Sequence, residues 1–517
     1  MRDLVNTPDP GMDVDGSIRG EGAAEKTYAV NQFDPARETS KLSYTPRRSA
    51  KTVFNTYQRG TSPLTLSGYV EADSAYDSRY HTVITDDYRQ GGPGADVAQI
   101  PGDAFDELVV GTLGIIGEQG RKGCIINQAA LLFKIASSEA DLPNQRGRVT
   151  FTDAWGDVLA HLGFGFSGDF SDDVAGNFTA AKAKGLLGAM TRLKKDHPNL
   201  KVGLNVGGWE FSEAFHHIAK EPTARTKFAD SIAQIFRAFP MFSTVHLDWQ
   251  FPDSPGAPGN AYGPQDVTNY AELIRVTKST LDPLVADGVT IAVSAPGTAE
   301  EIRAMNIPAL INAGATRINL LAYDYFGTPW SPSLGHHSPL RHTPQASHQH
   351  SVDAAVTYLV QEAKVDPGLI HLAYTTHSRN AHHAELTQTS PLKGPYAHQG
   401  ETVGTFESGT TTLADAVRNY LDLEAGAGRN GFTLHTDTDA DADYLYNPDS
   451  GIFMSLDTPR SVKAKAEYAR TNKLGGMYAV RADADTGLLA NAAREGLGHT
   501  ITDTVVDMKP LYVTGSH

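Results

Sequence analysis

Residues 242–252 read FSTVHLDWQFP, and this stretch decides the fold. The side chains of His246, Asp248 and Gln250 alternate along a β-type run, so they point to one face of the strand. A buried imidazole and a buried carboxylate each cost free energy unless they are paired or hydrogen-bonded. The stretch therefore predicts a buried strand that carries a polar site on its inner face.

Similar β-type runs recur along the chain and alternate with helical patterns. One helix is indicated by Phe228, Ile232, Ile235, Phe236 and Phe239, which recur at helical spacing. The stretch quoted above supplies a strand near residue 244. Seven more strands are expected near residues 64, 108, 202, 289, 317, 369 and 476. Alternating strands and helices are typical of βα units, and eight such units close into a barrel. We therefore expect an α/β protein with a (β/α)8 barrel, also called a TIM barrel.

The barrel pattern divides the chain into four parts. Residues 1–60 are polar without sustained periodicity, and we interpret them as an extended N-terminal arm. Residues 61–379 hold barrel strands 1–7. Residues 380–472 are too many for a loop, so they predict a small inserted α+β module between strands 7 and 8. Residues 473–517 then supply strand 8 and a C-terminal helix.

Charge and hydropathy exclude several classes of function. The 517 residues carry a formal net charge of −16, which repels phosphate backbones and anionic lipid but not a neutral polysaccharide. We expect no nucleic acid and no membrane as partner. The N-terminal sequence MRDLVNTPDPGMDVDG lacks the apolar core of a signal peptide, so export would need lysis or a dedicated route. Without such a route, the sequence predicts a cytoplasmic protein.

Two further segments place unusual residues at the carboxyl end of a strand, where barrels hold their active sites. KVGLNVGGW (201–209) contains Gly207 and Gly208, which permit positive φ angles or close backbone approach. In LAYD (321–324), polar residues follow directly after an apolar strand. Aromatic residues near these ends, among them Trp249 and Trp330, either floor a sugar groove or pack the barrel top.

Together, the three segments resemble glycoside hydrolase family 18, the chitinase family. The SxGG motif of its third strand is matched by residues 205–208, NVGG. The MxYD motif of its sixth strand falls on residues 321–324, including Tyr323 and Asp324. The DxxDxDxE motif of its fourth strand falls on Ser243, His246, Asp248 and Gln250. The resemblance runs from about residue 61 to the end of the chain.

Within that family, the chain is most similar to the chitinase-like subunits of bacterial insecticidal toxin complexes (Tc or ABC toxins). The segments that carry this likeness are FPMFSTVHLDWQFP (239–252), HTDTDADADYLYN (435–447), SLDTPRSVKAKAEYAR (455–470) and LGGMYAVRADADTGLLANAAREG (474–496). The resemblance implies other subunits of a large toxin assembly as partners. It also implies chitin or N-acetylglucosamine oligomers as ligands, and no cofactor.

The resemblance implies a catalytic site that is degenerate in this chain. In active members, the terminal Glu of the strand-4 motif protonates the glycosidic oxygen while the substrate's own acetamido group attacks the sugar. The preceding Asp orients that group, and the Tyr of strand 6 donates to its oxygen. Gln250 stands at the acid position, and its amide has no titratable proton to deliver. Loss of general acid catalysis alone costs roughly 10²–10⁴ in rate.

Three more departures centre on the same pocket. His246 and Ser243 replace two acids of the strand-4 motif, and Val480 aligns with the family's Trp that floors the sugar site. A deliberate Glu→Gln exchange would explain Gln250 but not the other three. Four acids in the segments that follow the strands could replace the lost acid, namely Asp253, Glu210, Glu300 and Glu301.

Two other patterns raise the question of a metal. The segment GHHSPLRHTPQASHQH (335–350) is rich in histidine but lacks the fixed spacing of a zinc motif, so we expect solvated loop histidines. The acidic run DTDADAD (437–443) lacks the Gly and the terminal Glu of a calcium-binding hand. We therefore expect no metal site.

Three functions remain open on the sequence. The first is a catalytically inactive chitinase-like protein that acts as a structural or glycan-binding subunit of a toxin assembly. The second is an active chitinase that hydrolyses β-1,4-linked N-acetylglucosamine polymers, and the third is a stand-alone chitin-binding lectin. In each case the site residues are expected to be Gln250, Asp248, Tyr323, Asp324 and His246, with Trp249, Gly207, Gly208, Trp330 and Val480 in contact with substrate.

Overall fold

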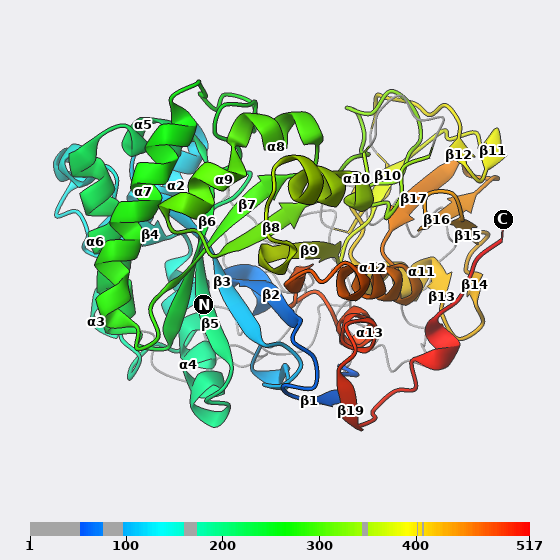
Figure 1. The fold of residues 1–517 in the computed structure, drawn as a ribbon, viewed down its shortest axis with the longest axis horizontal. Helices are drawn as coiled ribbons and strands as arrows, with labels where there is room; N and C mark the ends of the chain where they lie inside the picture. Colours follow the sequence, from blue (N-terminus) through cyan, green and yellow to red (C-terminus); the bar gives the residue numbers. More distant parts are fainter. Residues whose placement is uncertain are drawn as a thin grey trace, which may run out of the picture.

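A closed barrel of parallel strands forms the centre of the molecule (Figure 1). The computed structural model describes residues 52–75, 97–159, 173–343, 350–400, 402–405 and 408–516. Around the barrel, the strands are β2 (Thr65–Glu71), β3 (Glu107–Ile115), β5 (Lys201–Gly207), β6 (Phe242–Asp248), β7 (Thr290–Pro296), β8 (Arg317–Leu321), β9 (Ile370–Thr375) and β18 (Gly476–Val480). Because β2 pairs with both β3 and β18, the ring closes, and the predicted (β/α)8 barrel is confirmed.

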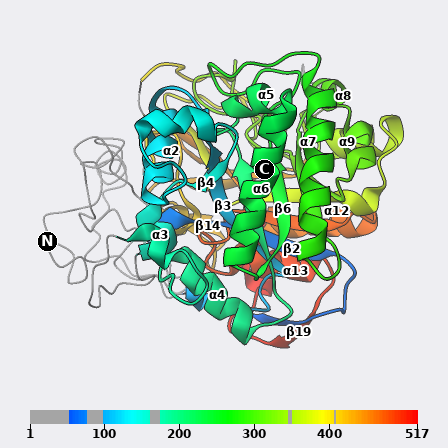
Figure 2. The ribbon, with the colours of Figure 1, turned by 90° about the vertical axis from the view of Figure 1, so that its left-hand side faces the viewer.

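Helices surround the barrel and bury their apolar faces against it. The longest are α2 (Gly120–Leu132), α4 (Leu186–Asp196), α6 (Pro222–Ala238), α7 (Asp266–Leu281) and α12 (Pro459–Thr471). Figure 2 shows α6 and α7 side by side in front of β6. Phe228 and Ile232 on α6 are fully buried, which confirms the helical stripe expected from their spacing. No helix in the described ranges is long and apolar enough to cross a membrane.

An antiparallel sheet lies between β9 and β18 in the sequence, at the right of Figure 1. Its strands, in sheet order, are β10 (Arg379–Ala381), β17 (Ile452–Leu456), β16 (Ala442–Asn447) and β15 (Thr433–Asp437). The helix α11 (Leu413–Asn419) belongs to the same segment. In contrast, α12 packs on β9, β18 and α13 (Leu488–Gly496). We therefore propose that the insertion ends before α12 and that this helix belongs to the barrel.

The acidic run within this insertion has a structural role. The Asp437 carboxylate accepts hydrogen bonds from the Leu392 amide at 2.8 Å and from His336 Nε2 at 2.9 Å. The Asp443 carboxylate accepts from Arg460 Nε at 3.0 Å. These buried carboxylates tie the sheet to the loop that follows β8 and to α12.

The predicted N-terminal arm falls mostly outside the described residues, which begin at residue 52. Its last part is paired with the C-terminal region, because β1 (Thr56–Gln58) forms an antiparallel pair with β19 (Thr500–Asp503). Asn55 extends this contact by donating from Nδ2 to the Val506 carbonyl at 2.9 Å. The end of the expected arm is therefore docked on the barrel's C-terminal segment.

A layer of buried polar groups fills the barrel interior beneath the mouth. Arg317 Nη1 on β8 lies 2.5 Å from Glu107 Oε2 on β3, and both side chains are buried. Arg317 Nε also donates to Asn319 Oδ1 at 2.9 Å. Burial alone would raise the pKa of Glu107, but the Arg317 charge and His246 hold it below its ordinary value. The pair is therefore ionised, and each charge depends on the other.

We expect Arg317→Met to lower the free energy of unfolding by about 3–5 kcal/mol, because Glu107 then stays buried without a counter-charge. Urea unfolding followed by circular dichroism measures the loss. The matched control is Arg275→Met, which breaks the exposed pair with Glu272 and should cost less than about 1 kcal/mol. Equal losses in the two variants would contradict the role of the buried pair.

Candidate active site

Asp248 and Gln250 lie together at the carboxyl end of β6. Asp248 is the last residue of the strand, and the Gln250 side chain is only 8% exposed. Gln250 Nε2 donates to Asp248 Oδ1 at 2.9 Å, while its backbone amide donates to Ser212 Oγ at 2.9 Å. The predicted alternation thus brings both residues to one site at the barrel mouth.

The Asp248 carboxyl group is buried among hydrogen-bond donors. Burial raises its pKa above the ordinary value, and the hydrogen bonds from Ser294, Gln250 and Asn205, together with His246, oppose the rise. Because the Gln250 amide nitrogen faces Asp248, its carbonyl oxygen is turned away from that carboxylate. At this position the site therefore offers a neutral amide and no ionisable proton donor.

Gly207, which ends β5, and Gly208, which follows it, allow the chain to approach Asp248 closely. Gly207 and Gly208 have φ angles of 104° and 91°, in the left-handed region. The Gly208 amide donates to the Asp248 carbonyl at 2.7 Å. A Cβ on Gly207 would lie 2.5 Å from the Asp248 carbonyl oxygen and 2.7 Å from the Phe215 ring. Both expectations for the glycine pair, positive φ and close approach, are confirmed.

His246 faces the buried polar layer. Its Nδ1 lies 2.9 Å from the Tyr69 hydroxyl and 3.0 Å from Asn319 Nδ2, and its Nε2 lies 3.6 Å from Glu107 Oε1. Burial lowers the pKa of His246, although Glu107 opposes the shift. The imidazole is therefore neutral at pH 7, and it links the mouth to the Arg317–Glu107 pair.

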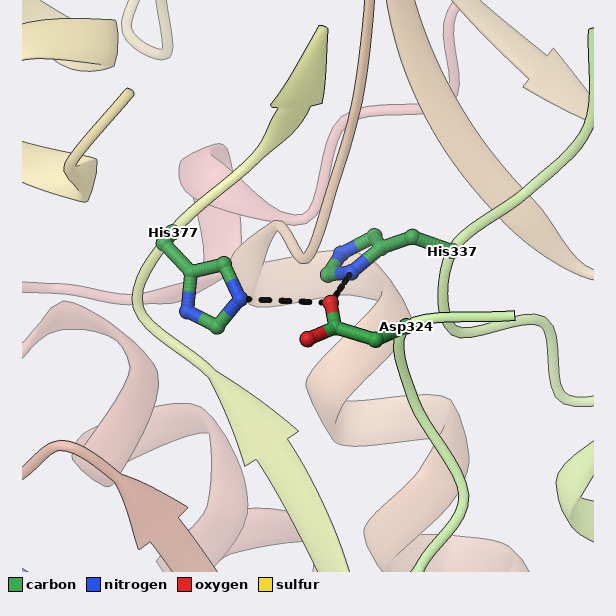
Figure 3. Close-up of side chains that lie close together, drawn as sticks. All are labelled: Asp324, His337 and His377. Carbon is green, nitrogen blue, oxygen red and sulfur yellow. Dashed lines mark hydrogen bonds and ion pairs between the residues drawn. The ribbon is translucent and has the colours of Figure 1, made fainter. Parts of the chain in front are cut away.

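Tyr323 and Asp324 follow β8 and contribute a second polar group of side chains. Burial raises the pKa of Tyr323, and the charge of Asp248 adds to the rise, so the two side chains share one electrostatic environment. Asp324, with a φ of 57°, accepts from Arg379 Nε at 2.8 Å. His337 also approaches its carboxylate, as Figure 3 shows. Burial opposes ionisation, yet Arg379 and the imidazoles hold the pKa of Asp324 well below its ordinary value.

The expected sugar contact of Trp249 is wrong. Its side chain is 1% exposed, stacks on Phe215 with ring centroids 5.4 Å apart and meets the Tyr270 ring edge-on. Residue 249 lies between two inward-pointing positions, so its side chain points out of the barrel into the helical layer. Trp249 is part of the core and presents no face to a ligand.

Other aromatic side chains are exposed near the strand ends. Trp330, in the loop after β8, is 54% exposed, and the Arg379 guanidinium lies 5.5 Å from its ring centroid. Trp209 and Tyr262 are also exposed, in the segments that follow β5 and β6. Val480 ends β18 beside Thr375 and is half-buried. Its aliphatic side chain supplies no ring on which a sugar could stack.

None of the four acids weighed as replacements hydrogen-bonds to Asp248 or Gln250 in the described ranges. Glu210 is 63% exposed and pairs with Lys122 at 2.6 Å. Glu301 accepts from Thr298 Oγ1 at 2.6 Å in the first turn of α8 (Ala299–Met305). Glu300 is exposed, and Asp253 is half-buried in a turn after β6.

The structure also brings residues to the mouth that the motifs did not indicate. They come from other strand ends and loops, and they are Ser212, Ser294, His337, His377 and Arg379. The expectation of solvated histidines is wrong for His336 and His337, because both are buried beneath the insertion. The histidine-rich segment 335–350 is evident in the sequence, but its composition does not indicate that His337 lies at the mouth.

The model of the glycosyl hydrolases family 18 matches residues 116–485. The chain belongs to glycoside hydrolase family 18. Two family 18 relatives come from Yersinia entomophaga. Chitinase 1 is 38% identical over 521 residues, which cover 99% of this chain and 94% of the relative. Chitinase 2 is 35% identical over 517 residues, which cover 95% of this chain and 81% of the relative.

A solved family 18 structure matches almost the whole molecule. It is described as the crystal structure of the chitinase Chi1 fitted into the three-dimensional structure of the Yersinia entomophaga toxin complex. The TM-score is 0.85 at 37% sequence identity, and the match covers 98% of this chain and 99% of that one. The barrel and its insertion are therefore shared with this relative.

We expect Gly207→Ala to destabilise this family 18 protein by about 3 kcal/mol, from the left-handed φ together with the clash against Asp248 and Phe215. Thermal unfolding measures the loss. Gly259→Ala is the matched control, because Gly259 has a φ of 98° but a Cβ added there would meet no atom within 4 Å. Gly259→Ala should lower the free energy of unfolding by only about 1–2 kcal/mol. An equal loss in both variants would show that close contact with Asp248 and Phe215 does not add to the cost at Gly207.

Proposed function

We propose that this protein is a chitinase homologue that has lost hydrolysis, binds N-acetylglucosamine oligomers and serves as a subunit of a bacterial toxin assembly. The observation that carries the proposal is the hydrogen bond from Gln250 Nε2 to Asp248 Oδ1 at 2.9 Å. A general acid must hold a proton that it can transfer near the working pH. A carboxamide at the acid position does not meet that requirement.

Glycan binding is compatible with the same mouth. Trp330 and Trp209 are 54% and 48% exposed near the strand ends, and aromatic rings are common stacking partners of sugars. Asp248 and Tyr323 keep the polar groups that, in active relatives, orient the acetamido group of the substrate. A neutral polymer is not repelled by a net charge of −16.

Membership in an assembly is supported by likeness over the whole chain. The relative that matches 98% of this chain is described within a toxin complex. We propose that this protein occupies a comparable place beside other toxin subunits. An isolated lectin would not need such partners.

An active chitinase is the second candidate, and the names of both relatives favour it. It needs a carboxyl group to replace the lost acid. Glu71, at the end of β2, is one candidate, because burial raises its pKa to about 7 while Arg481 opposes the rise. Its Oε2 accepts from Arg481 Nη1 at 2.8 Å, so it is already engaged in an ion pair.

We expect the unmodified chain to release no product above background from a fluorogenic chitotriose. The double variant Gln250→Glu, His246→Asp should release product at a rate at least about 10²-fold above that background. Gln250→Ala is the matched control and should be as inactive as the unmodified chain. Turnover by the unmodified chain within about tenfold of the double variant would overturn the proposal. If such turnover also vanished in Glu71→Gln, the second candidate would take its place.

Binding is tested separately on chitin beads. We expect the isolated chain to bind saturably and Trp330→Ala to weaken binding by about threefold to tenfold, because the exposed ring is lost. Leu284→Ala is the matched control, since Leu284 is an exposed apolar residue before β7 at the opposite end of the barrel. Equal binding by both variants would exclude Trp330 from the glycan site.

A further inference from the structure

Two imidazoles and one carboxylate from the connection after β8 and the segment after β9 meet beyond the ends of these strands (Figure 3). Asp324 follows β8, His337 lies further along the same connection, and His377 follows β9. Asp324 Oδ1 is 3.5 Å from His337 Nδ1 and 3.4 Å from His377 Nε2. All three atoms lie within 4.8 Å of one another.

We propose that Asp324, His337 and His377 bind a divalent transition-metal ion, for which zinc is the best match. Zinc bonds of about 2.0–2.2 Å place neighbouring ligand atoms of a tetrahedron about 3.3–3.5 Å apart. The Asp324–His337 and Asp324–His377 separations fall in that range and lie at the long end of the hydrogen-bond range. Imidazole and carboxylate ligands suit zinc, and three protein ligands leave a fourth position for water.

His337 is prepared to act as a ligand. Its side chain is 1% exposed, so the ring is held within the protein rather than in solvent. Its Nε2 lies 3.3 Å from Thr375 Oγ1, which in turn lies 3.3 Å from Asp457 Oδ2. A hydrogen bond from Nε2 to Thr375 would leave Nδ1 as the coordinating atom.

The surrounding charges limit the affinity but do not block the site. Arg379 contacts Asp324 through Nε on Oδ1 and through Nη2 on Oδ2. A carboxylate oxygen has two lone pairs. Oδ1 can therefore accept a hydrogen bond from Arg379 with one and coordinate a metal ion with the other. The neighbouring Asp457 is paired with Lys465 at 2.6 Å, so its charge is compensated. We therefore expect weaker binding than at a thiolate zinc site.

The proposal does not depend on glycan binding or on the loss of hydrolysis. Asp324 is shared with the expected sugar site, but the two histidines come from loop segments outside the family 18 motifs. A bound metal would join the loops after β8 and β9 and so fix that side of the barrel mouth. The occupant is identified only by its ligand chemistry, as a divalent ion that prefers nitrogen and oxygen donors.

The test uses the full chain, stripped of metal with a chelator and titrated with Zn²⁺ by calorimetry. We expect one site per chain, and we expect His377→Gln and His337→Asn each to weaken it by at least about tenfold. His377 is half-buried, so its variant tests the site without opening the core. His398→Gln is the matched control, because His398 is exposed in the insertion, and it should leave the affinity unchanged.

A cobalt titration gives a second readout, since tetrahedral coordination by nitrogen and oxygen gives visible absorption that should be lost in His377→Gln. Circular dichroism checks that each variant is folded. The proposal is overturned if the unmodified chain binds no stoichiometric zinc. It is also overturned if folded His377→Gln binds zinc as tightly as the unmodified chain. That result would mean that zinc binds only to surface histidines elsewhere.

Discussion

The hydrogen bond between the Gln250 amide and the Asp248 carboxylate determines what the barrel mouth can do. Both side chains are buried, and Ser212 fixes the backbone of Gln250 through a second hydrogen bond. The amide nitrogen satisfies a buried carboxylate that would otherwise cost free energy. It does so as a neutral carboxamide, which carries no proton that a general acid could transfer.

The remaining substitutions are consistent with the proposed loss of hydrolysis. An acid at position 246 would add a second carboxyl group close to Asp248 and above Glu107. The neutral His246 instead lies within hydrogen-bonding distance of Tyr69 and faces the ionised Arg317–Glu107 pair. The neutral His246 therefore adds no net charge to the Arg317–Glu107 pair in the barrel interior, and the barrel strands around it are kept.

The strands and the positions of Asp248 and Gln250 could be predicted because alternation and the βα pattern are local properties of the sequence. The sugar contact expected of Trp249 is wrong, although the same alternation points this side chain away from the residues on either side.

The grouping of Asp324, His337 and His377 could not be predicted, because it depends on where the loops after β8 and β9 lie in space. His336 and His337 contact the insertion through Asp437 and Ser455, and His337 also lies against Thr375 of β9.

The central claim is that no ionisable group among the described residues reaches the linkage that an active relative would cleave. A crystal structure of the unmodified chain soaked with chitotetraose tests it most directly. The account predicts an intact tetrasaccharide with one glycosidic oxygen beside Gln250 and no carboxyl group within about 3.2 Å of that oxygen. Cleaved sugars in the site, or a carboxyl group within that distance, would contradict it.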